Sequence, residues 1–311
     1  MKNNQVMIYG AYGYAGELMV REAVAQGLRP IIAGRDDEKL KPIATELSLE
    51  CRAFGVRNTG SNLQDISVLL NCAGPFSATA EPLARACLAQ QIHYLDITGE
   101  IDIFRKCHAL DEEARQQNVL ILPGAGTDIV PTDCLAAMLK EKLPVATRID
   151  LALSFGTNPS IGTVNTMIES FGKGGLIREG GMLKVVSNAF QMRKIPFQNK
   201  PQWAMTIPWG DVFTSGISTG VPDGAVYMAM PRMSIYMIRL TNPVKGILNT
   251  QLGQKITKRL AGWLMKKGPD AKALEAERGQ FWGEAEAPDG EKLEMTMSTP
   301  NVYALTATVG I

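Results

Sequence analysis

Residues 6–16 read VMIYGAYGYAG, and this stretch decides the fold of the chain. The apolar run 6–9 has no polar alternation, which is typical of a parallel strand that is buried on both faces. Gly10 permits a tight turn away from the strand. Gly13 removes a side chain where the backbone would approach phosphate oxygens, and Gly16 lets the following helix pack closely on the strand. The stretch therefore predicts a strand, a glycine turn and a helix in immediate succession.

The predicted helix covers residues 14–26 and stops at Gly27, a good C-terminal cap. The unpaired N–H groups of its first turn and the positive end of the helix dipole favour an anion at this point. We therefore expect a dinucleotide pyrophosphate here, and the alternative is a glycine turn without a ligand. The predicted contacts are Gly10, Ala11, Tyr12, Gly13, Tyr14, Ala15 and Gly16.

A second segment, residues 31–35 (IIAGR), indicates which dinucleotide is bound. Folds that bind NAD usually place Asp or Glu at the end of the second strand, where the acid accepts hydrogen bonds from the ribose hydroxyls. Here the strand ends in Gly34 and Arg35, and the first acids are Asp36 and Asp37. Gly34 would leave room for a 2′-phosphate, and the Arg35 guanidinium could hold that phosphate through paired charge-assisted hydrogen bonds. Unless Arg35 is only a solvated residue that begins the next helix, the segment predicts NADP(H).

The composition is that of an ordinary soluble enzyme. The chain has 311 residues, and 32 basic against 31 acidic residues give a net charge of +1, so nothing attracts it to nucleic acid or anionic lipid. The five cysteines are odd in number with no CxxC pair, and with two histidines they predict no metal site and reduced thiols in a cytoplasm. There is no recognisable signal peptide, and no apolar run reaches the ~20 residues of a membrane span. We expect a cytoplasmic protein.

The first half of the chain repeats the pattern of strand and helix. Further apolar runs lie at 68–71, 94–97 and 119–122, a weaker one lies at 51–56, and helical patterns cover 36–48, 79–90 and 102–117. Strands that alternate with helices favour a parallel sheet with right-handed crossovers. The predicted fold class is α/β, with an N-terminal Rossmann domain, a doubly wound parallel sheet, over residues 1–143.

After residue 143 the pattern changes to that of a second, α+β domain on a mostly antiparallel sheet. Residues 147–155 alternate apolar and polar side chains, as a half-buried antiparallel strand does. Further strands are expected at 203–207, 213–218, 225–230, 281–287 and 291–299, and helices at 162–171 and 244–267. We assign residues 144–300 to substrate binding and dimerisation, since an exposed sheet edge can pair with a second copy. Residues 301–311 form a C-terminal segment that is expected to return to the Rossmann domain.

Polar and small residues follow the predicted strands, at the edge of the sheet where such folds bind ligands. Small residues after the strand 68–71 would let the chain pass close to the ribose and nicotinamide, and hydroxyl and backbone groups follow the strand 94–97. Asp96 is as well placed to cap a turn as to bind a ligand. The predicted cofactor contacts at this edge, besides Gly34 and Arg35, are Asn71, Cys72, Ala73, Gly74, Pro75, Thr98 and Gly99.

Glu100 and Asp128 are the catalytic candidates because each follows a predicted strand of the sheet. Thr132 and Asp133, in contrast, are better explained as candidates to cap the helix that opens there. None of the seven tyrosines begins a Tyr-x-x-x-Lys pair, so short-chain dehydrogenase chemistry is excluded. His93 begins a strand and His108 lies within a helix, which favours structural roles for both. An acid catalyst must therefore be Asp, Glu, Tyr, Cys or water.

The motifs of the chain, in this order and spacing, resemble the saccharopine dehydrogenase-like NADP-binding superfamily over residues 5–307. In the first half they are GAYGYAG (10–16), AGR (33–35), NCAGPF (71–76), HYLDITGE (93–100) and PGAGTDIVPTD (123–133). The second half is similar to the trans-acting enoyl reductase branch. Its motifs are SIGTVNTM (160–167), GGLIR (174–178), IPWGD (207–211), STGVP (218–222) and TPNVYALT (299–306).

This resemblance implies a Rossmann domain, a saccharopine-reductase-like second domain and an NAD(P)H-dependent reduction. It implies pyrophosphate contact at 10–16, 2′-phosphate contact at Arg35, and cofactor contact at 72–75 and around 98–100. Many members carry an Asp near the adenine after the third strand, where this chain reads Phe54-Gly55-Val56-Arg57.

The sequence therefore predicts an NADPH-dependent oxidoreductase that reduces an enoyl, imine or carbonyl group of a small substrate. The substrate is expected to be fairly apolar because the glycine-punctuated loops 156–181 and 207–224 lie near Trp203 and Trp209. Imine reduction would require cationic groups for carboxylates, and the candidates are Arg178, Arg193 and Arg232. The alternative is an NADP-binding sensor or scaffold protein without turnover.

Overall fold

The computed structural model describes residues 5–155, 174–244, 250, 253 and 276–311, and the chain divides into two compact units. The first unit contains residues up to Asp128 together with Tyr303–Ile311, and the second contains Ile129–Val302. The predicted boundary after residue 143 falls at the end of a helix that the structure groups with the second unit. The predicted helices at 162–171 and 244–267 lie outside the described residues or almost entirely so.

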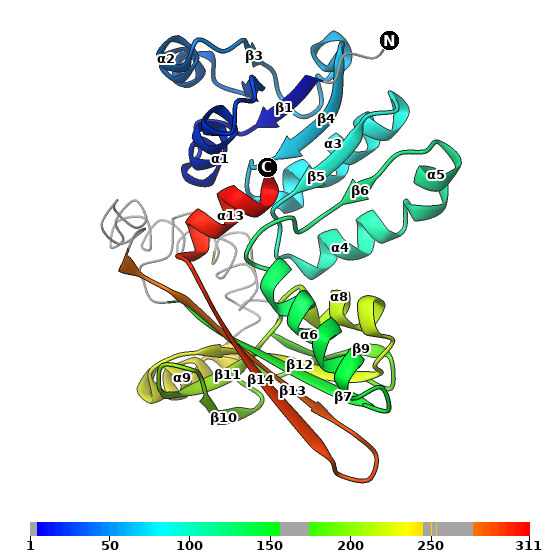
Figure 1. Ribbon diagram of the computed structural model, residues 1–311, viewed down its shortest axis with the longest axis vertical. Coiled ribbons are helices and arrows are strands. Elements are labelled where there is room, and N and C mark those ends of the chain that lie inside the picture. The colour runs from blue at the N-terminus through cyan, green and yellow to red at the C-terminus, as the bar shows by residue number, and fades with distance from the viewer. Residues whose placement is uncertain (1–4, 156–173, 245–249, 251–252, 254–275) are drawn as a thin grey trace. The chain divides into compact units, whose positions relative to one another are not determined.

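The first unit is a six-stranded parallel sheet in the order β3-β2-β1-β4-β5-β6 (Figure 1). In this order β2 and β3 are added on one side of β1, and β4, β5 and β6 on the other, as in a dinucleotide-binding Rossmann fold. The strands are β1 (Gln5–Tyr9), β2 (Ile31–Gly34), β3 (Cys51–Ala53), β4 (Ile66–Asn71), β5 (His93–Asp96) and β6 (Ile121–Leu122). The helices are α1 (Tyr14–Ala25), α2 (Asp37–Leu47), η1 (Gly60–Leu63), α3 (Phe76–Ala89), α4 (Ile101–His108), α5 (Asp111–Gln116) and α13 (Val302–Gly310).

The strands of this sheet are apolar because helices cover both faces. Met7 and Leu69 belong to the core on one face, with Leu83 of α3. Ile8 belongs to the core on the other face, with Met19 of α1. The alternation of neighbouring residues between two cores confirms that the unbroken apolar run of β1 is a strand buried on both sides.

The C-terminal helix α13 completes the first unit. Ala307 is buried in the same core as Met19, and the rings of Tyr303 and Tyr14 meet edge to face with centroids 5.0 Å apart. The Thr306 side chain also accepts a hydrogen bond from the backbone N–H of Thr127, at 3.1 Å. The segment that follows the second unit therefore packs against α1 and anchors the loop that precedes Asp128.

The predicted single helix over 102–117 is wrong, because two short helices, α4 and α5, occupy this stretch. The chain turns at Ala109 and buries Leu110, which is 5% exposed, in the core with Ala114. The three acids that open α5, Asp111, Glu112 and Glu113, favour a new helix N-terminus at this point through the helix dipole.

The second unit is built on an eight-stranded sheet in which β10-β11-β12-β7-β13-β14 are successive neighbours and β8 and β9 form a hairpin attached to β12. All pairings are antiparallel except β7 with β12, so the expected mostly antiparallel sheet is confirmed. The strands are β7 (Arg148–Ser154), β8 (Gly175–Glu179), β9 (Met182–Val186), β10 (Met192–Pro196), β11 (Pro201–Ile207), β12 (Asp223–Ala229), β13 (Gly279–Glu286) and β14 (Lys292–Thr299). The helices are α6 (Val130–Lys142), α8 (Asp211–Thr219), α9 (Arg232–Leu240) and η2 (Asn242–Val244).

Strand β7 is a central strand and not the half-buried strand that its alternation predicts. It lies between β12 and β13, and every residue after Arg148 is buried. Asp150 can be buried because its carboxylate lies 2.9 Å from Arg148 and accepts a 3.0 Å hydrogen bond from the N–H of Ala225. The polar side chain was expected to be solvated by water, and here an internal ion pair and a hydrogen bond take the place of that solvation.

The predicted strand at 213–218 is also wrong, since α8 covers this stretch. Its buried side chains, at Asp211, Val212 and Ser215, have helical spacing, and Gly220 ends the helix with a φ of +67°. The apolar residues of this segment have high strand propensity, which the tertiary packing overrides.

Candidate functional site

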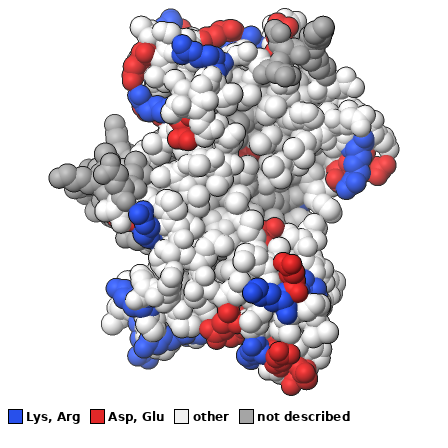
Figure 2. Space-filling view, in the orientation of Figure 1, with Lys and Arg blue, Asp and Glu red and all other residues white. Residues whose placement is uncertain are grey.

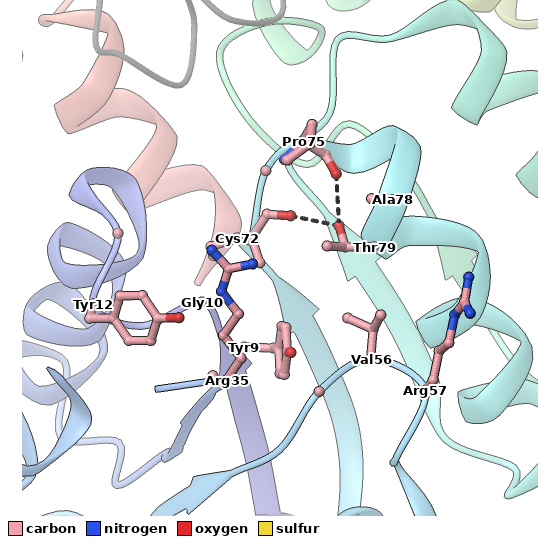
Figure 3. Close-up of a pocket in the computed structure, with 15 residues that line it drawn as sticks. Tyr9, Gly10, Tyr12, Arg35, Val56, Arg57, Cys72, Pro75, Ala78 and Thr79 are labelled. Atoms are coloured by element: carbon pink, nitrogen blue, oxygen red, sulfur yellow. Dashed lines mark hydrogen bonds between the residues drawn. The ribbon is translucent and has the colours of Figure 1, made fainter. Parts of the chain in front are cut away.

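A cavity of about 500 Å³ lies at the carboxyl ends of β1 to β4 in the first unit (Figure 3). Each of these strands contributes the residues that directly follow it or end it, and α3 contributes its first turns. The lining residues are Tyr9, Gly10, Tyr12, Gly13, Gly34, Arg35, Gly55, Val56, Arg57, Cys72, Ala73, Gly74, Pro75, Ala78 and Thr79. The topology thus brings together four separate strand ends at the point where Rossmann folds bind dinucleotides.

The glycine turn has the geometry that a closely approaching phosphate requires. Gly10 has a φ of +85°, and a Cβ there would lie 2.7 Å from the backbone nitrogen of Ala73. A Cβ on Gly16 would lie 2.2 Å from the carbonyl oxygen of Gly10. Gly13 precedes α1, and no side chain caps that N-terminus. The positive end of the α1 dipole therefore points toward the place where an anion would bind.

The role predicted for Gly34 differs from its environment in the structure. A Cβ on Gly34 would lie 2.6 Å from the ring of Tyr12, so the glycine makes room for that ring. Arg35 is exposed, follows β2 directly and enters the cavity between Tyr12 and Tyr9 (Figure 3). Lys39 of α2 lies 5.6 Å from the centre of the Tyr12 ring. The cavity thus carries a guanidinium at the position that the sequence predicts, beside an aromatic ring.

The loop after β4 is held in place by its own hydrogen bonds. The side-chain amide oxygen of Asn71 accepts from the N–H of Ala73 at 3.0 Å. The Thr79 hydroxyl donates to the backbone carbonyl of Ala73 at 2.6 Å (Figure 3). Burial raises the pKa of the Cys72 thiol well above its ordinary range, so this cysteine is no nucleophile. The loop therefore offers backbone and small side chains, as expected, on a rigid support.

A buried network lies beneath the ends of β4 and β5. The Asn71 amide donates to the Tyr94 hydroxyl at 3.1 Å, and Tyr94 donates to the Asp96 carboxylate at 2.9 Å. The other Asp96 oxygen accepts from the N–H groups of Thr98 and Gly124, each at 3.0 Å. Desolvation raises the pKa of Asp96 to about 6 despite these donors. Asp96 thus ties the loops after β5 and β6 together.

Tyr94→Phe is expected to lower the free energy of unfolding by roughly 1–3 kcal/mol, because Asn71 and Asp96 lose a shared buried partner. The Tyr94 hydroxyl favours the ionised form of Asp96, so the loss is larger above about pH 6, where the folded state carries the carboxylate. Urea denaturation on either side of that pH measures the effect. Tyr9→Phe is the control, since it loses a 2.9 Å hydrogen bond to a neutral carbonyl, that of Phe54. A pH-independent loss in Tyr94→Phe contradicts the prediction.

The two catalytic candidates occupy different environments. A Glu100 oxygen accepts a hydrogen bond from the N–H of Phe76, at 3.2 Å, where α3 begins. This carboxylate therefore supports the cofactor loop. Asp128 lies beside Gly99, since a Cβ on that glycine would be 3.2 Å from its Oδ2 atom. Desolvation raises the pKa of Asp128 to about 7, which suits an acid that works near neutral pH.

The other predicted contacts lie around the cavity and are not among its lining residues. Ala11, Asn71 and Thr98 are fully buried, Gly16 packs against Gly10, and Gly99 lies beside Asp128. Tyr14 packs on Tyr303, and Ala15 lies in the same first turn of α1. Sequence reasoning missed six lining residues, which are Tyr9, Gly55, Val56, Arg57, Ala78 and Thr79. The departure from the family pattern at 54–57 was the available signal for Val56 and Arg57, and nothing pointed to Thr79.

The part of the chain that the structure describes contains no cluster of three or more His, Cys, Asp or Glu that could hold a metal ion. Nor does that part contain a helix both long and apolar enough to cross a membrane.

Comparison with known proteins identifies the first unit. Residues 6–122 match the family described as "Saccharopine dehydrogenase NADP binding domain". A saccharopine dehydrogenase-like oxidoreductase of Rattus norvegicus is 25% identical over 65% of this chain and 53% of its own length. A Mycobacterium tuberculosis protein that carries the name trans-acting enoyl reductase is 28% identical over 59% of this chain and 44% of its own length. The chain spans about half the length of the curated relatives that it matches.

The fold has a counterpart among solved structures. Saccharopine dehydrogenase (L-Glu forming) from Saccharomyces cerevisiae superposes with a TM-score of 0.63 over 99% of this chain and 89% of its own, at 9% identity. The glycine turn, the helix N-terminus and Arg35 fit a phosphorylated dinucleotide, and the resemblance found in the sequence is confirmed. Residues 6–122 of the first unit are thus similar to the NADP-binding domain of saccharopine dehydrogenases.

Proposed function

We propose that this protein is an NADPH-dependent reductase of an enoyl or carbonyl group, with imine reduction as the less supported reaction. The observation that carries the proposal is the presence of Arg35 in the same cavity as the glycine turn. The names of the matching relatives, saccharopine dehydrogenase-like oxidoreductase and trans-acting enoyl reductase, support it. We further propose a small, fairly apolar substrate, a cytoplasmic location and a homodimer, each of which stays a prediction from the sequence.

The residues of the cavity have distinct proposed roles in holding NADPH. The N-terminus of α1 and the backbone at Gly10 and Gly13 would bind the pyrophosphate. Arg35 would bind the 2′-phosphate, since a guanidinium matches the geometry of phosphate oxygens. The loop 72–75 would lie along the ribose and nicotinamide.

When bound, NADPH supplies a hydride to one carbon of the double bond that is reduced. We propose that Asp128 donates a proton from its carboxyl group to the atom at the other end of that bond. A pKa of about 7 leaves a large share of Asp128 protonated at neutral pH. Thr306, which holds the backbone of Thr127, would keep this carboxyl in position.

The arginines considered for a carboxylated imine substrate have internal partners. Arg178 is buried and donates to the carbonyls of Val212 and Val221. Arg193 makes two 3.1 Å hydrogen bonds to Glu284. The Arg232 guanidinium lies 5.0 Å from the centre of the Trp203 ring and donates to the Tyr236 hydroxyl. These contacts support an enoyl or carbonyl substrate over an imine that carries carboxylates.

Arg35→Ala is expected to weaken NADPH binding by roughly ten- to a hundred-fold, because a bidentate charged contact is lost. NADH binding should change by less than about two-fold, since NADH has no 2′-phosphate. Isothermal titration calorimetry with both cofactors measures the difference. Arg57→Ala is the matched control, since it removes a second exposed guanidinium that lines the same cavity. If Arg57→Ala loses NADPH selectively and Arg35→Ala does not, the assignment of Arg35 is wrong.

Turnover separates the reductase from a sensor or scaffold. The purified chain is mixed with NADPH and a panel of enoyl, keto and imine compounds, and the loss of nicotinamide absorbance is followed. A reductase oxidises NADPH with at least one class of compound. Tight NADPH binding without oxidation across the panel favours the sensor.

A further inference from the structure

Helix α9 of the second unit presents an apolar stripe to solvent. Met233, Tyr236, Met237 and Leu240 follow the spacing i, i+3, i+4 and i+7, which places them on one face of the helix. They are 71%, 38%, 58% and 72% exposed, whereas Ile235 on the opposite face is fully buried. An amphipathic helix of a soluble domain normally exposes a polar face, whereas α9 buries Ile235 and also exposes an apolar stripe.

The outward orientation of α9 is held by specific contacts at both ends. Near its C-terminus, Arg239 donates to the carbonyl of Ala189 at 2.9 Å. The side chain of Asn242 accepts from the N–H of Asn188 at 2.8 Å, just beyond the helix. At its N-terminus, Arg232 stacks over Trp203 of β11, against which α9 packs. The apolar stripe is therefore a fixed surface of the fold.

The surroundings of the stripe are basic. Residues 224–244 contain Arg232 and Arg239 and no Asp or Glu. Residues 187–210, which hold β10 and β11, contain Lys194, Lys200 and again no acid, while their Arg193 is paired with Glu284. Figure 2 shows Lys and Arg gathered at the lower left of the face in view, where Figure 1 places α9 and β10. A second copy docked on this surface would bring like charges together, which disfavours self-association.

We propose that α9 is a docking surface for an anionic lipid membrane, with Met233, Met237 and Leu240 inserted between the headgroups. The net charge of +1 gave no reason to expect attraction to anionic lipid, and the proposal rests instead on the local excess of cations in segments without Asp or Glu. A helix that lies in the membrane interface buries its apolar side chains at the boundary of the acyl chains and keeps Arg or Lys at its flanks. Arg232, an exposed residue one turn before Tyr236, is placed for contact with lipid phosphates, and Tyr236 combines an apolar ring with a polar hydroxyl. This inference concerns the second unit alone and does not depend on the proposed reduction.

The chain offers a matched control for the test. Met182 and Val185 of β9 are 73% and 65% exposed, so they are apolar and accessible like the residues of α9. They lie on a hairpin and not on a helical stripe. The double variants M237D/L240D and M182D/V185D introduce the same charge at exposed apolar sites. Any difference in their binding to vesicles therefore depends on where the charge is placed and not on the charge itself.

Binding is measured by sedimentation of the purified full chain with vesicles of phosphatidylcholine and phosphatidylserine, and with vesicles of phosphatidylcholine alone. The wild type and M182D/V185D should bind the anionic vesicles, and added NaCl should weaken this binding. M237D/L240D should bind at least roughly ten-fold less, since two inserted side chains are lost and two anions face the lipid. Circular dichroism and thermal unfolding check that both variants fold like the wild type.

Three results overturn the proposal. The first is a wild type that sediments with neither kind of vesicle, and the second is an equal loss of binding in both double variants. The third is a wild type that is dimeric by light scattering and becomes monomeric in M237D/L240D without any binding to vesicles. This third result assigns the stripe to a second copy of the chain.

Discussion

Gly16→Ala is expected to abolish tight NADPH binding and to destabilise the first unit by several kcal/mol. The added Cβ would lie 2.2 Å from the carbonyl oxygen of Gly10 and 2.9 Å from its carbonyl carbon. Because both contacts are with backbone, α1 and the turn must move apart, which costs more than the ~1–3 kcal/mol typical of an extra methyl group in a core. The displaced N–H groups of α1 would no longer converge on the pyrophosphate, and we expect affinity to fall by more than roughly a hundred-fold.

The effect of Gly16→Ala is measured by calorimetry with NADPH and by urea denaturation. Gly55→Ala is the control for unfolding, because a Cβ at Gly55 meets no atom within 4 Å and the backbone there has no positive φ. A Gly16→Ala variant with wild-type affinity and stability contradicts the close packing of the helix on the turn.

Asp128→Asn is expected to lower kcat by roughly 10²- to 10⁴-fold, the range for loss of a general acid, while the dissociation constant of NADPH changes little. The desolvated carboxyl has a pKa of about 7, so its protonated form is present at lower pH and is lost as the pH rises through 7. The kcat of the wild type should therefore fall above about pH 7. Asparagine carries no ionisable proton, so this dependence should disappear in the variant.

The measurement is the pH profile of NADPH oxidation, with the substrate of the panel that reacts fastest. Glu100→Gln separates the two carboxylates, because Glu100 accepts from Phe76 beside the cofactor loop and should affect the KM for NADPH more than the pH profile. If Asp128→Asn keeps the wild-type kcat and pH profile, another group or water is the proton donor.

The features that were predicted most accurately from the sequence are those that depend on residues close together in the chain. Helix α1 starts at Tyr14 and ends at Ala25, one residue before the predicted end, because the glycines on both sides limit it. The position of Arg35 in the cavity also followed from the sequence, since the carboxyl ends of parallel strands meet at one edge of a sheet.

The failed predictions concern residues whose environment comes from distant parts of the chain. The polar positions of β7 indicate exposure, yet Asp150 is buried because Arg148 and Arg193 neutralise it. The segment 213–218 has strand propensity, and only its packing in the second unit makes it helical. Gly34 lines the cavity, and its predicted cofactor contact stays a prediction; its packing against the Tyr12 ring is a further contact that no local pattern reveals. In each case the environment of the residue is determined by packing against residues far away in the sequence, and this packing cannot be predicted from a single sequence.

The return of α13 to the first unit has a consequence for the synthesis of this protein. Tyr303–Ile311 pack with residues up to Asp128, so the whole second unit is an insertion within the first. A ribosome must translate Ile129–Val302 before the side chain that anchors Thr127, that of Thr306, exists. The nascent nucleotide-binding unit therefore stays incomplete, with the core position of Ala307 unfilled, until residues 303–311 emerge. Its completion is thus coupled to the synthesis of the second unit, which is encoded between its two segments.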